Sequence, residues 1–175
     1  MADKTLQLKN NITTEVEGVT ASAGAADAGK IAALGPDGRF DDSLLPAGIG
    51  ADTKIYPASE VLAAGDYVNI WDDAGTAKVR KADASAANAG KRAHGFVRAG
   101  VGAIGSDATV YFEGPNSSLS GLSPGATYVL SHTTPGGVVP LASGTTTAGH
   151  ILQVLGVATD VGEINAEIGN PVVRA

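Results

Sequence analysis

One segment of the chain matches the sequence pattern of a serine nucleophile. Residues 121–125 (Gly-Leu-Ser-Pro-Gly) fit the G-x-S-x-G elbow, in which the residue after the serine donates its backbone N–H to the oxyanion hole. That residue is Pro124, which has no N–H, and the residues after it favour a strand where the elbow requires a helix. We therefore interpret the segment as a turn. A hydrolase on a small β scaffold would require turnover that Ser123→Ala abolishes.

Two glycine-rich segments match phosphate-binding patterns only in part. Residues 100–105 fit G-x-G-x-x-G, but residues 106–112 favour a strand, whereas a dinucleotide site needs a helix to begin there. Residues 24–30 fit most of a phosphate-binding loop, with Ile31 at the position where a Ser or Thr would hold magnesium. The first pattern predicts a glycine hairpin and the second a flexible spacer. We expect no cofactor.

The residues that most often bind metals are few and widely spaced. The chain has no cysteine, and its three histidines are His94, His132 and His150, which do not have the spacing of metal ligands. Asp41-Asp42 and Asp72-Asp73 lack the alternating acids and the glycine of a calcium loop. We therefore expect no metal site, and we interpret these acids as residues of solvated turns.

The composition narrows the class of protein. The 175 residues carry a net charge of −6, which disfavours binding to nucleic acid or to an anionic membrane. No apolar run approaches the length of a signal peptide or of a membrane span. The absence of cysteine indicates folding in a reducing cytosol. Aromatic residues make up only 5% of the chain, so we expect a thin core and stabilisation by association. Six basic residues form a middle section that we interpret as a solvated hairpin face: Lys78, Arg80, Lys81, Lys91, Arg92 and Arg98.

Alternation and turn residues predict an all-β fold for residues 51–160, in the form of a small barrel or sandwich. The clearest element is a hairpin over residues 64–82, with its turn at residues 72–75. The expected strands cover residues 66–71, 77–81, 94–99, 108–112, 127–131, 138–141 and 151–158. For the tail, residues 161–175, the pattern allows an edge strand that pairs with another chain.

A second copy of the hairpin pattern follows about sixty residues later along the chain. Gly65, Tyr67 and Gly75 correspond to Gly125, Tyr128 and Gly136, and residues 95–97 (Gly-Phe-Val) correspond to residues 156–158 (Gly-Val-Ala). We interpret this as an internal duplication that gives two similar three-strand units, at about residues 64–99 and 124–158. Chance similarity between two glycine-rich hairpins is the alternative.

Residues 1–50 differ from the rest of the chain and predict an extended N-terminal arm for attachment and oligomerisation. Lys4–Lys9 alternates like a short strand, Ala21–Gly29 is a small-residue spacer, and Gly35–Gly38 is a strong turn signal. Between the small residues stand apolar side chains that we expect at a capsid or subunit interface: Leu6, Leu8, Ile31, Leu34, Phe40, Leu44 and Leu45. The alternative is a disordered leader.

Residues 29–46 (Gly-Lys-Ile-Ala-Ala-Leu-Gly-Pro-Asp-Gly-Arg-Phe-Asp-Asp-Ser-Leu-Leu-Pro) resemble a recurrent segment of tailed-bacteriophage virion proteins. That segment has Gly-Lys-Ile, then Asp-Gly-Lys-hydrophobic-Asp, then Ser-Leu-Leu-Pro, and it occurs in head-fibre or decoration proteins and in tail-fibre proteins. Residues 121–130 and 153–158 are similar to small β modules of the same class.

The resemblance implies a non-enzymatic capsid decoration protein, either a head cement or a head fibre, that binds the major capsid protein and stabilises the head. It implies a homo-oligomer, often a trimer, on the capsid surface of the virion after synthesis in the host cytoplasm. The alternative is a tail-fibre or tail-tip protein that binds a host receptor or carbohydrate. Five aromatic residues would then include a stacking platform for sugar rings: Tyr56, Tyr67, Trp71, Tyr111 and Tyr128.

Overall fold

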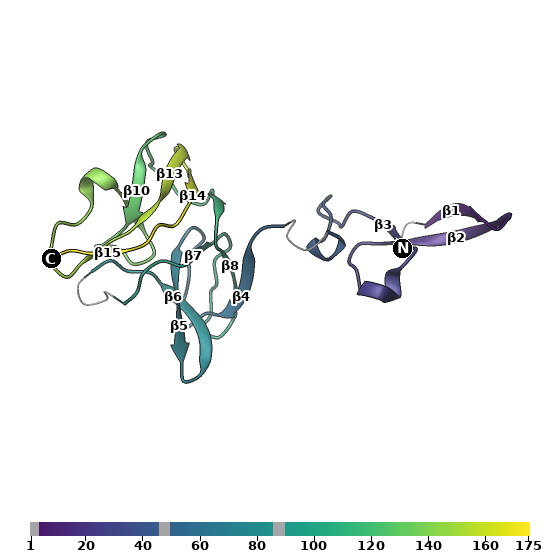
Figure 1. The fold of residues 1–175 in the computed structure, drawn as a ribbon, viewed down its shortest axis with the longest axis horizontal. Helices are drawn as coiled ribbons and strands as arrows, with labels where there is room; N and C mark the ends of the chain where they lie inside the picture. The colour runs from purple at the N-terminus through teal and green to yellow at the C-terminus, as the bar shows by residue number, and fades with distance from the viewer. Residues whose placement is uncertain (1–3, 46–49, 86–89) are drawn as a thin grey trace. The chain divides into compact units, whose positions relative to one another are not determined.

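The computed structural model describes residues 4–45, 50–85 and 90–175. The chain forms two compact units, Met1–Gly50 and Ala51–Ala175, which are drawn in Figure 1. The prediction of an all-β fold is confirmed. In the described part of the chain the sheets form no closed barrel, which agrees with a sandwich.

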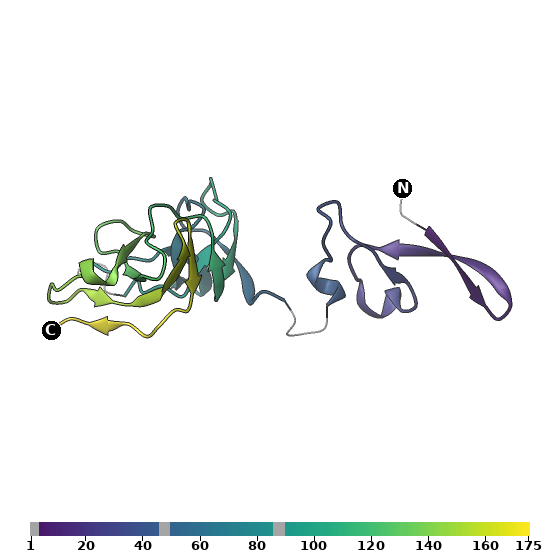
Figure 2. The same ribbon diagram turned by 90° about the horizontal axis from the view of Figure 1, so that it is seen from above.

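The first unit contains a three-stranded sheet. Strand β1 (Lys4–Lys9) pairs antiparallel with β2 (Ile12–Val19), and β2 pairs in parallel with the short β3 (Ile31–Ala32). The two residues between β1 and β2, Asn10 and Asn11, have φ angles of 53° and 61°, as a type I′ turn requires. Figure 2 shows the twist of this hairpin.

After β2, the expected spacer contains a 3₁₀ helix, η1 (Gly24–Asp27). Asp27 accepts hydrogen bonds from the backbone N–H of Ala23 at 2.5 Å and from Nζ of Lys30 at 2.7 Å. The bond from Lys30 is the main cause that lowers the pKa of the Asp27 carboxyl. The lysine of the partial phosphate-loop pattern is thus bound within its own loop.

The end of the first unit is made of turns. The expected turn at Gly35–Gly38 is present, with the Gly38 N–H donating to the Gly35 carbonyl at 2.9 Å. A second 3₁₀ helix, η2 (Asp42–Leu44), is capped by Asp41, whose carboxylate accepts from the Ser43 N–H at 2.9 Å. Ser43 also connects the segment to the end of β2, because its Oγ accepts the Ser22 N–H at 2.8 Å.

The second unit contains two five-stranded antiparallel sheets with the same topology. The first sheet has the spatial order β4 (Thr53–Pro57), β8 (Asp107–Tyr111), β7 (Gly95–Val97), β5 (Tyr67–Asp73) and β6 (Thr76–Lys81). The second has the order β9 (Gly114–Asn116), β14 (Glu163–Ala166), β13 (Val154–Asp160), β10 (Thr127–Leu130) and β11 (Val138–Pro140). The two similar units are confirmed, and each extends beyond the expected three strands to a whole sheet.

Equivalent backbone hydrogen bonds support the correspondence between the sheets. The Gly65 N–H donates to the Val97 carbonyl at 2.8 Å, and the Gly125 N–H donates to the Ala158 carbonyl at 2.8 Å. A second matching pair joins Leu62 to Val101 at 3.0 Å and Leu122 to Val161 at 2.9 Å. The sequence match therefore corresponds to the same local geometry in both sheets.

The tail lies mainly inside the fold. Strand β14 lies between β13 and β9, with Ile164 and Ala166 buried, so it is not the edge strand that was expected from residue 161 onward. Of the two strands in the tail, only β15 (Val172–Val173) pairs on one side alone, and its partner is β12 (Ile151–Leu152) of the same chain. The apolar alternation of residues 163–166 is explained by burial within this chain.

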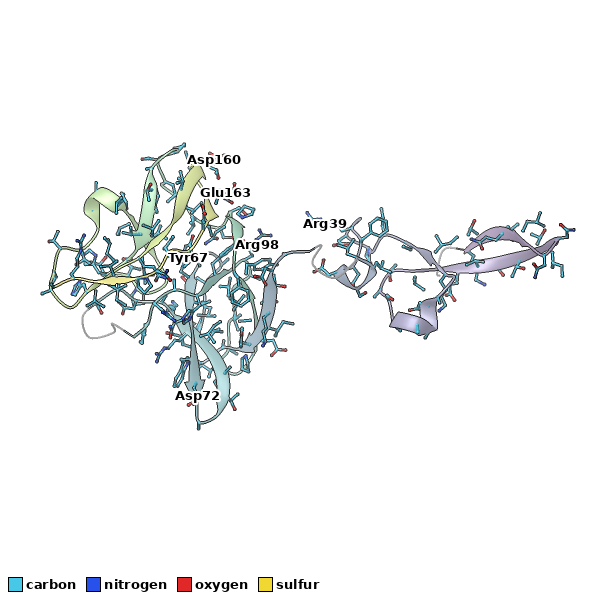
Figure 3. All side chains as sticks on the ribbon, viewed as in Figure 1. Arg39, Tyr67, Asp72, Arg98, Asp160 and Glu163 are labelled. Atoms are coloured by element: carbon cyan, nitrogen blue, oxygen red, sulfur yellow. The ribbon has the colours of Figure 1, made fainter. Side chains whose placement is uncertain are left out.

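The two sheets share one part of the core. The shared cluster contains Tyr67 and Phe96 from the first sheet and Leu130, Leu155 and Ala166 from the second, and Figure 3 labels Tyr67 between them. Each sheet also has a cluster of its own, centred on Val68 and Val79 in the first and on Tyr128 and Ile164 in the second. The second unit is therefore held together by apolar contacts that cross between its sheets.

Candidate interaction surface of the N-terminal unit

The first unit has no buried side chain among its described residues. Leu6, Leu8 and Ile12 are 71%, 72% and 67% exposed, and the other side chains described in residues 4–45 are exposed or half-buried. A small sheet needs an apolar face packed on something to be stable in water. The sheet of the first unit therefore lacks, within its own unit, the packing that would stabilise it.

The register of the hairpin places apolar side chains on both faces of the sheet. Leu6 lies opposite Glu15 and Leu8 opposite Thr13, and residues directly opposite each other share a face. Beside Leu6, Nζ of Lys4 lies 3.2 Å from Oε1 of Glu15 in an exposed ion pair. Figure 3 shows the side chains of the hairpin standing on both sides of the ribbon.

The opposite face carries its own apolar side chains. Ile12 and Val16 alternate with the residues that share the face of Leu6. Ile31 on β3 pairs with Gly18 and lies on the same face as Val16. Sequence reasoning missed Ile12 and Val16. The Asn10-Asn11 pair followed by alternation over residues 12–16 was the signal that could have found them.

The remaining predicted interface residues lie in the segment after β3. Leu34 is 53% and Phe40 is 51% exposed, whereas Leu44 and Leu45 are half-buried. Phe40 borders a depression of about 210 Å³ together with Pro36 and Arg39. The seven predicted residues thus fall into three groups: Leu6 and Leu8 on one face, Ile31 on the other, and four in this segment.

The structure and the comparisons with known proteins add three findings. In the described residues, no group of three or more His, Cys, Asp or Glu side chains is placed to hold a metal ion. No described helix is long and apolar enough to cross a membrane. No protein-family model, curated protein or solved structure matches the chain.

Proposed function

We propose that the protein is a non-enzymatic virion structural protein of a tailed bacteriophage that decorates the outer surface of the capsid and stabilises the head. The sequence of residues 29–46 suggests this class of protein. The observation that carries the attachment role is the complete absence of buried side chains among the described residues of the first unit. Such a sheet is stabilised when a partner covers it.

We assign the two faces of the β1–β2 hairpin to neighbouring copies of the chain. A face with Leu6 and Leu8 and a different face with Ile12 and Val16 suit a ring in which each copy contacts two others through unlike surfaces. Three copies make the smallest such ring, which agrees with the trimer expected from the resemblance. The segment with Leu34 and Phe40 is then left for the major capsid protein.

Apolar burial of this kind favours attachment. At about 25 cal/mol per Å², covering about 500 Å² of apolar surface contributes on the order of 12 kcal/mol before the costs of ordering. Those costs are large for a segment this rich in small residues, so binding depends on several copies acting together. A protein bound across neighbouring capsid subunits stabilises the closed shell by mass action.

The double variant Leu6→Asp/Leu8→Asp is expected to weaken self-association at least tenfold, because two carboxylates would be buried at the subunit contact. Sedimentation equilibrium of the full chain measures this. The matched control is Ile104→Asp, since Ile104 is 72% exposed in the second unit. Equal association constants for the double variant and the control would remove the hairpin from the interface.

Deleting residues 1–50 is expected to lower binding to undecorated heads at least tenfold, because the deletion removes every apolar side chain assigned to the attachment surface. Co-sedimentation of purified heads with the truncated and the full-length protein measures the difference. Intact secondary structure of residues 51–175, checked by circular dichroism, shows that the loss comes from the arm. Unchanged binding to heads contradicts the proposal.

The tail-tip alternative depends on a platform of exposed aromatic rings. Tyr67 and Tyr128 are buried in the core, and burial raises the pKa of the Tyr67 phenol above its usual value. Tyr111 stacks on Phe96 with a centroid distance of 5.7 Å, and Arg98 lies over its ring. These contacts favour a core role for three of the five aromatic residues, and so they favour decoration over receptor binding by such a platform.

A further inference from the structure

A basic cavity lies beside strands β5 and β6 of the second unit. It has a volume of about 430 Å³, and Trp71, Arg80, Arg92 and His94 line it together with apolar residues such as Pro171 and Val173. A second cavity of about 250 Å³ shares Arg92 and His94 with the first. Among the residues that the structure describes, no carboxylate lines either cavity, so the local charge from these residues is positive in a chain whose net charge is −6.

Arg80 and Arg92 differ from two of the other four basic residues in the middle section. Lys78 pairs with Asp73 at 2.6 Å, and Lys81 pairs with Asp66 at 3.4 Å. In the part of the chain that the structure describes, neither Arg80 nor Arg92 forms an ion pair with a carboxylate. Their charges are therefore available to a ligand.

A buried amide positions both arginines. Asn69 is 1% exposed and lies directly opposite Arg80 in the β5–β6 ladder. Its Oδ1 accepts from Nε of Arg80 at 3.0 Å, and its Nδ2 donates to the backbone carbonyl of Arg92 at 2.8 Å. One buried side chain thus fixes a guanidinium group on one strand and the backbone of a distant segment.

The aromatic wall of the cavity is fixed as well. The guanidinium carbon of Arg80 lies 4.7 Å from the centre of the Trp71 ring, a cation–π contact. The indole N–H of Trp71 donates to Oγ of Ser59 at 3.2 Å. Because the ring and the cation hold each other, the cavity has a preformed planar wall.

No single tautomer of a neutral histidine can make both hydrogen bonds of the His94 ring, because both ring nitrogens would have to accept. Nδ1 of His94 accepts the backbone N–H of Ile70 at 2.9 Å, so the neutral ring carries its proton on Nε2. Nε2 lies 2.9 Å from Nε of Arg92, which is also a donor. With the proton on Nε2, two donors face each other, so the exposed side chain of Arg92 gains no hydrogen bond there and can turn its donors toward an anionic ligand in the cavity.

We propose that this cavity binds an acidic sugar residue, with the carboxylate of the sugar at Arg92 and His94 and its ring against Trp71. A planar guanidinium matches a carboxylate in shape and charge. The volume lies within the range of small-ligand pockets, which combine apolar walls with a few fixed polar groups. A sugar ring offers an apolar C–H face to the side of the indole that Arg80 does not cover, and hydroxyl groups to the polar rim. The site does not depend on the proposed attachment of the first unit.

Titration with glucuronate tests the proposal, and Trp71 is the reporter because it is the only tryptophan in the chain. For a ligand of this size we expect a saturable fluorescence change with a Kd on the order of 1 mM. Arg92→Ala is expected to weaken binding at least tenfold, with Arg92→Lys in between, because lysine keeps the charge but not the fork. Arg92 is exposed, so both variants should fold.

The control variant is Arg39→Ala, which makes the same change of charge in the first unit and should titrate like the unaltered protein. Glucose, which lacks the carboxylate, and inorganic sulfate, which lacks the ring, should each bind at least tenfold more weakly than glucuronate. The proposal is overturned if glucuronate gives no saturable change or if Arg92→Ala binds as well as Arg39→Ala. It is also overturned if glucose or sulfate binds as tightly as glucuronate.

Discussion

Replacing Gly156 with alanine should destabilise the second unit by about 3–5 kcal/mol, which is among the larger effects of a single substitution. A Cβ atom at this position would lie 2.1 Å from the carbonyl oxygen of Asn165 and 2.9 Å from Cγ2 of Ile164. The φ angle of Gly156 is +148°, a conformation that L side chains rarely adopt. Neither β13 nor β14 can relieve the clash without separating, because Gly156 pairs with Ala166 across them.

The equivalent glycine of the first sheet should behave in the same way. At Gly95 a Cβ atom would lie 2.5 Å from Cγ1 of Val110 and 2.6 Å from the carbonyl oxygen of Tyr111. Gly102→Ala is the matched control, because an added Cβ there meets nothing within 4 Å. Urea unfolding followed by Trp71 fluorescence gives the three free energies. A loss below about 1 kcal/mol at Gly156, as expected only for an unconstrained surface site, would contradict the geometry.

The hairpins were predictable from the sequence because their information is local. Alternation over residues 66–71 and 77–81 predicted β5 and β6. The turn between these strands has positive φ angles at Ala74 and Gly75. The second hairpin was found from the same signals, and the match at Gly65 and Gly125 reflects hydrogen bonds that both sheets repeat. Turn chemistry and strand alternation therefore identified the two units.

Of the strands that complete the sheets, β8 corresponds to the strand expected at residues 108–112, but others were not predictable in the same way. Strand β9 has three residues, and one of them is Pro115, which lacks an N–H and normally argues against a strand. Its place at the outer edge of the sheet tolerates that loss. Strand β14 was expected at an edge, because nothing local in residues 163–166 indicates that β9 would cover its far side.

The candidate sites also differ in whether local sequence patterns could predict them. Leu6 and Leu8 were predicted because they alternate within one strand. The residues on the opposite face could not be predicted, because they depend on the register between β1 and β2. The cavity was not found, because Asn69, Arg92 and His94 are brought together only when β5 meets the segment before β7. The sequence analysis interpreted the basic residues of this section as a solvated hairpin face. Lys78 and Lys81 fit that interpretation, because they form ion pairs with nearby carboxylates. Arg80 and Arg92 fit it less well, because they line the cavity.

Gln153 provides a polar link between the two halves of the second unit. Its side chain is 1% exposed, with Oε1 accepting the Ala93 N–H at 2.8 Å. Its Nε2 donates to the carbonyl oxygens of Ala93 at 2.9 Å and Gly169 at 3.0 Å. The segment before β7 and the segment after β14 are therefore joined through one amide group, and within the described part of the chain no backbone–backbone hydrogen bond is present at Ala93.

Gln153→Leu should lower the free energy of unfolding by about 3–4 kcal/mol, because three backbone groups lose their partner and each orphaned group costs about 1–3 kcal/mol. Thr146→Leu is the control, since Thr146 is exposed in the second unit and should change stability by about 0.5 kcal/mol or less. Urea unfolding monitored through Trp71 measures both variants. A cost at position 153 no larger than the control would show that the amide link is dispensable.

Gln153→Glu separates the loss of hydrogen bonds from the change in packing, because it keeps the shape and the acceptor for the Ala93 N–H. The second carboxyl oxygen would face the carbonyl oxygens of Ala93 and Gly169, and it can donate to them only when protonated. The pKa of the introduced carboxyl is therefore raised in the folded state above its unfolded value of about 4.3.

The stability of this variant should depend on pH. The unfolded state binds fewer protons than the folded state between the two pKa values, so stability falls as pH rises through that window. We expect the variant to approach the unaltered protein below about pH 4 and to lose stability progressively above it. A pH-independent difference between the two proteins would mean that packing, and not the donated hydrogen bonds, holds this junction.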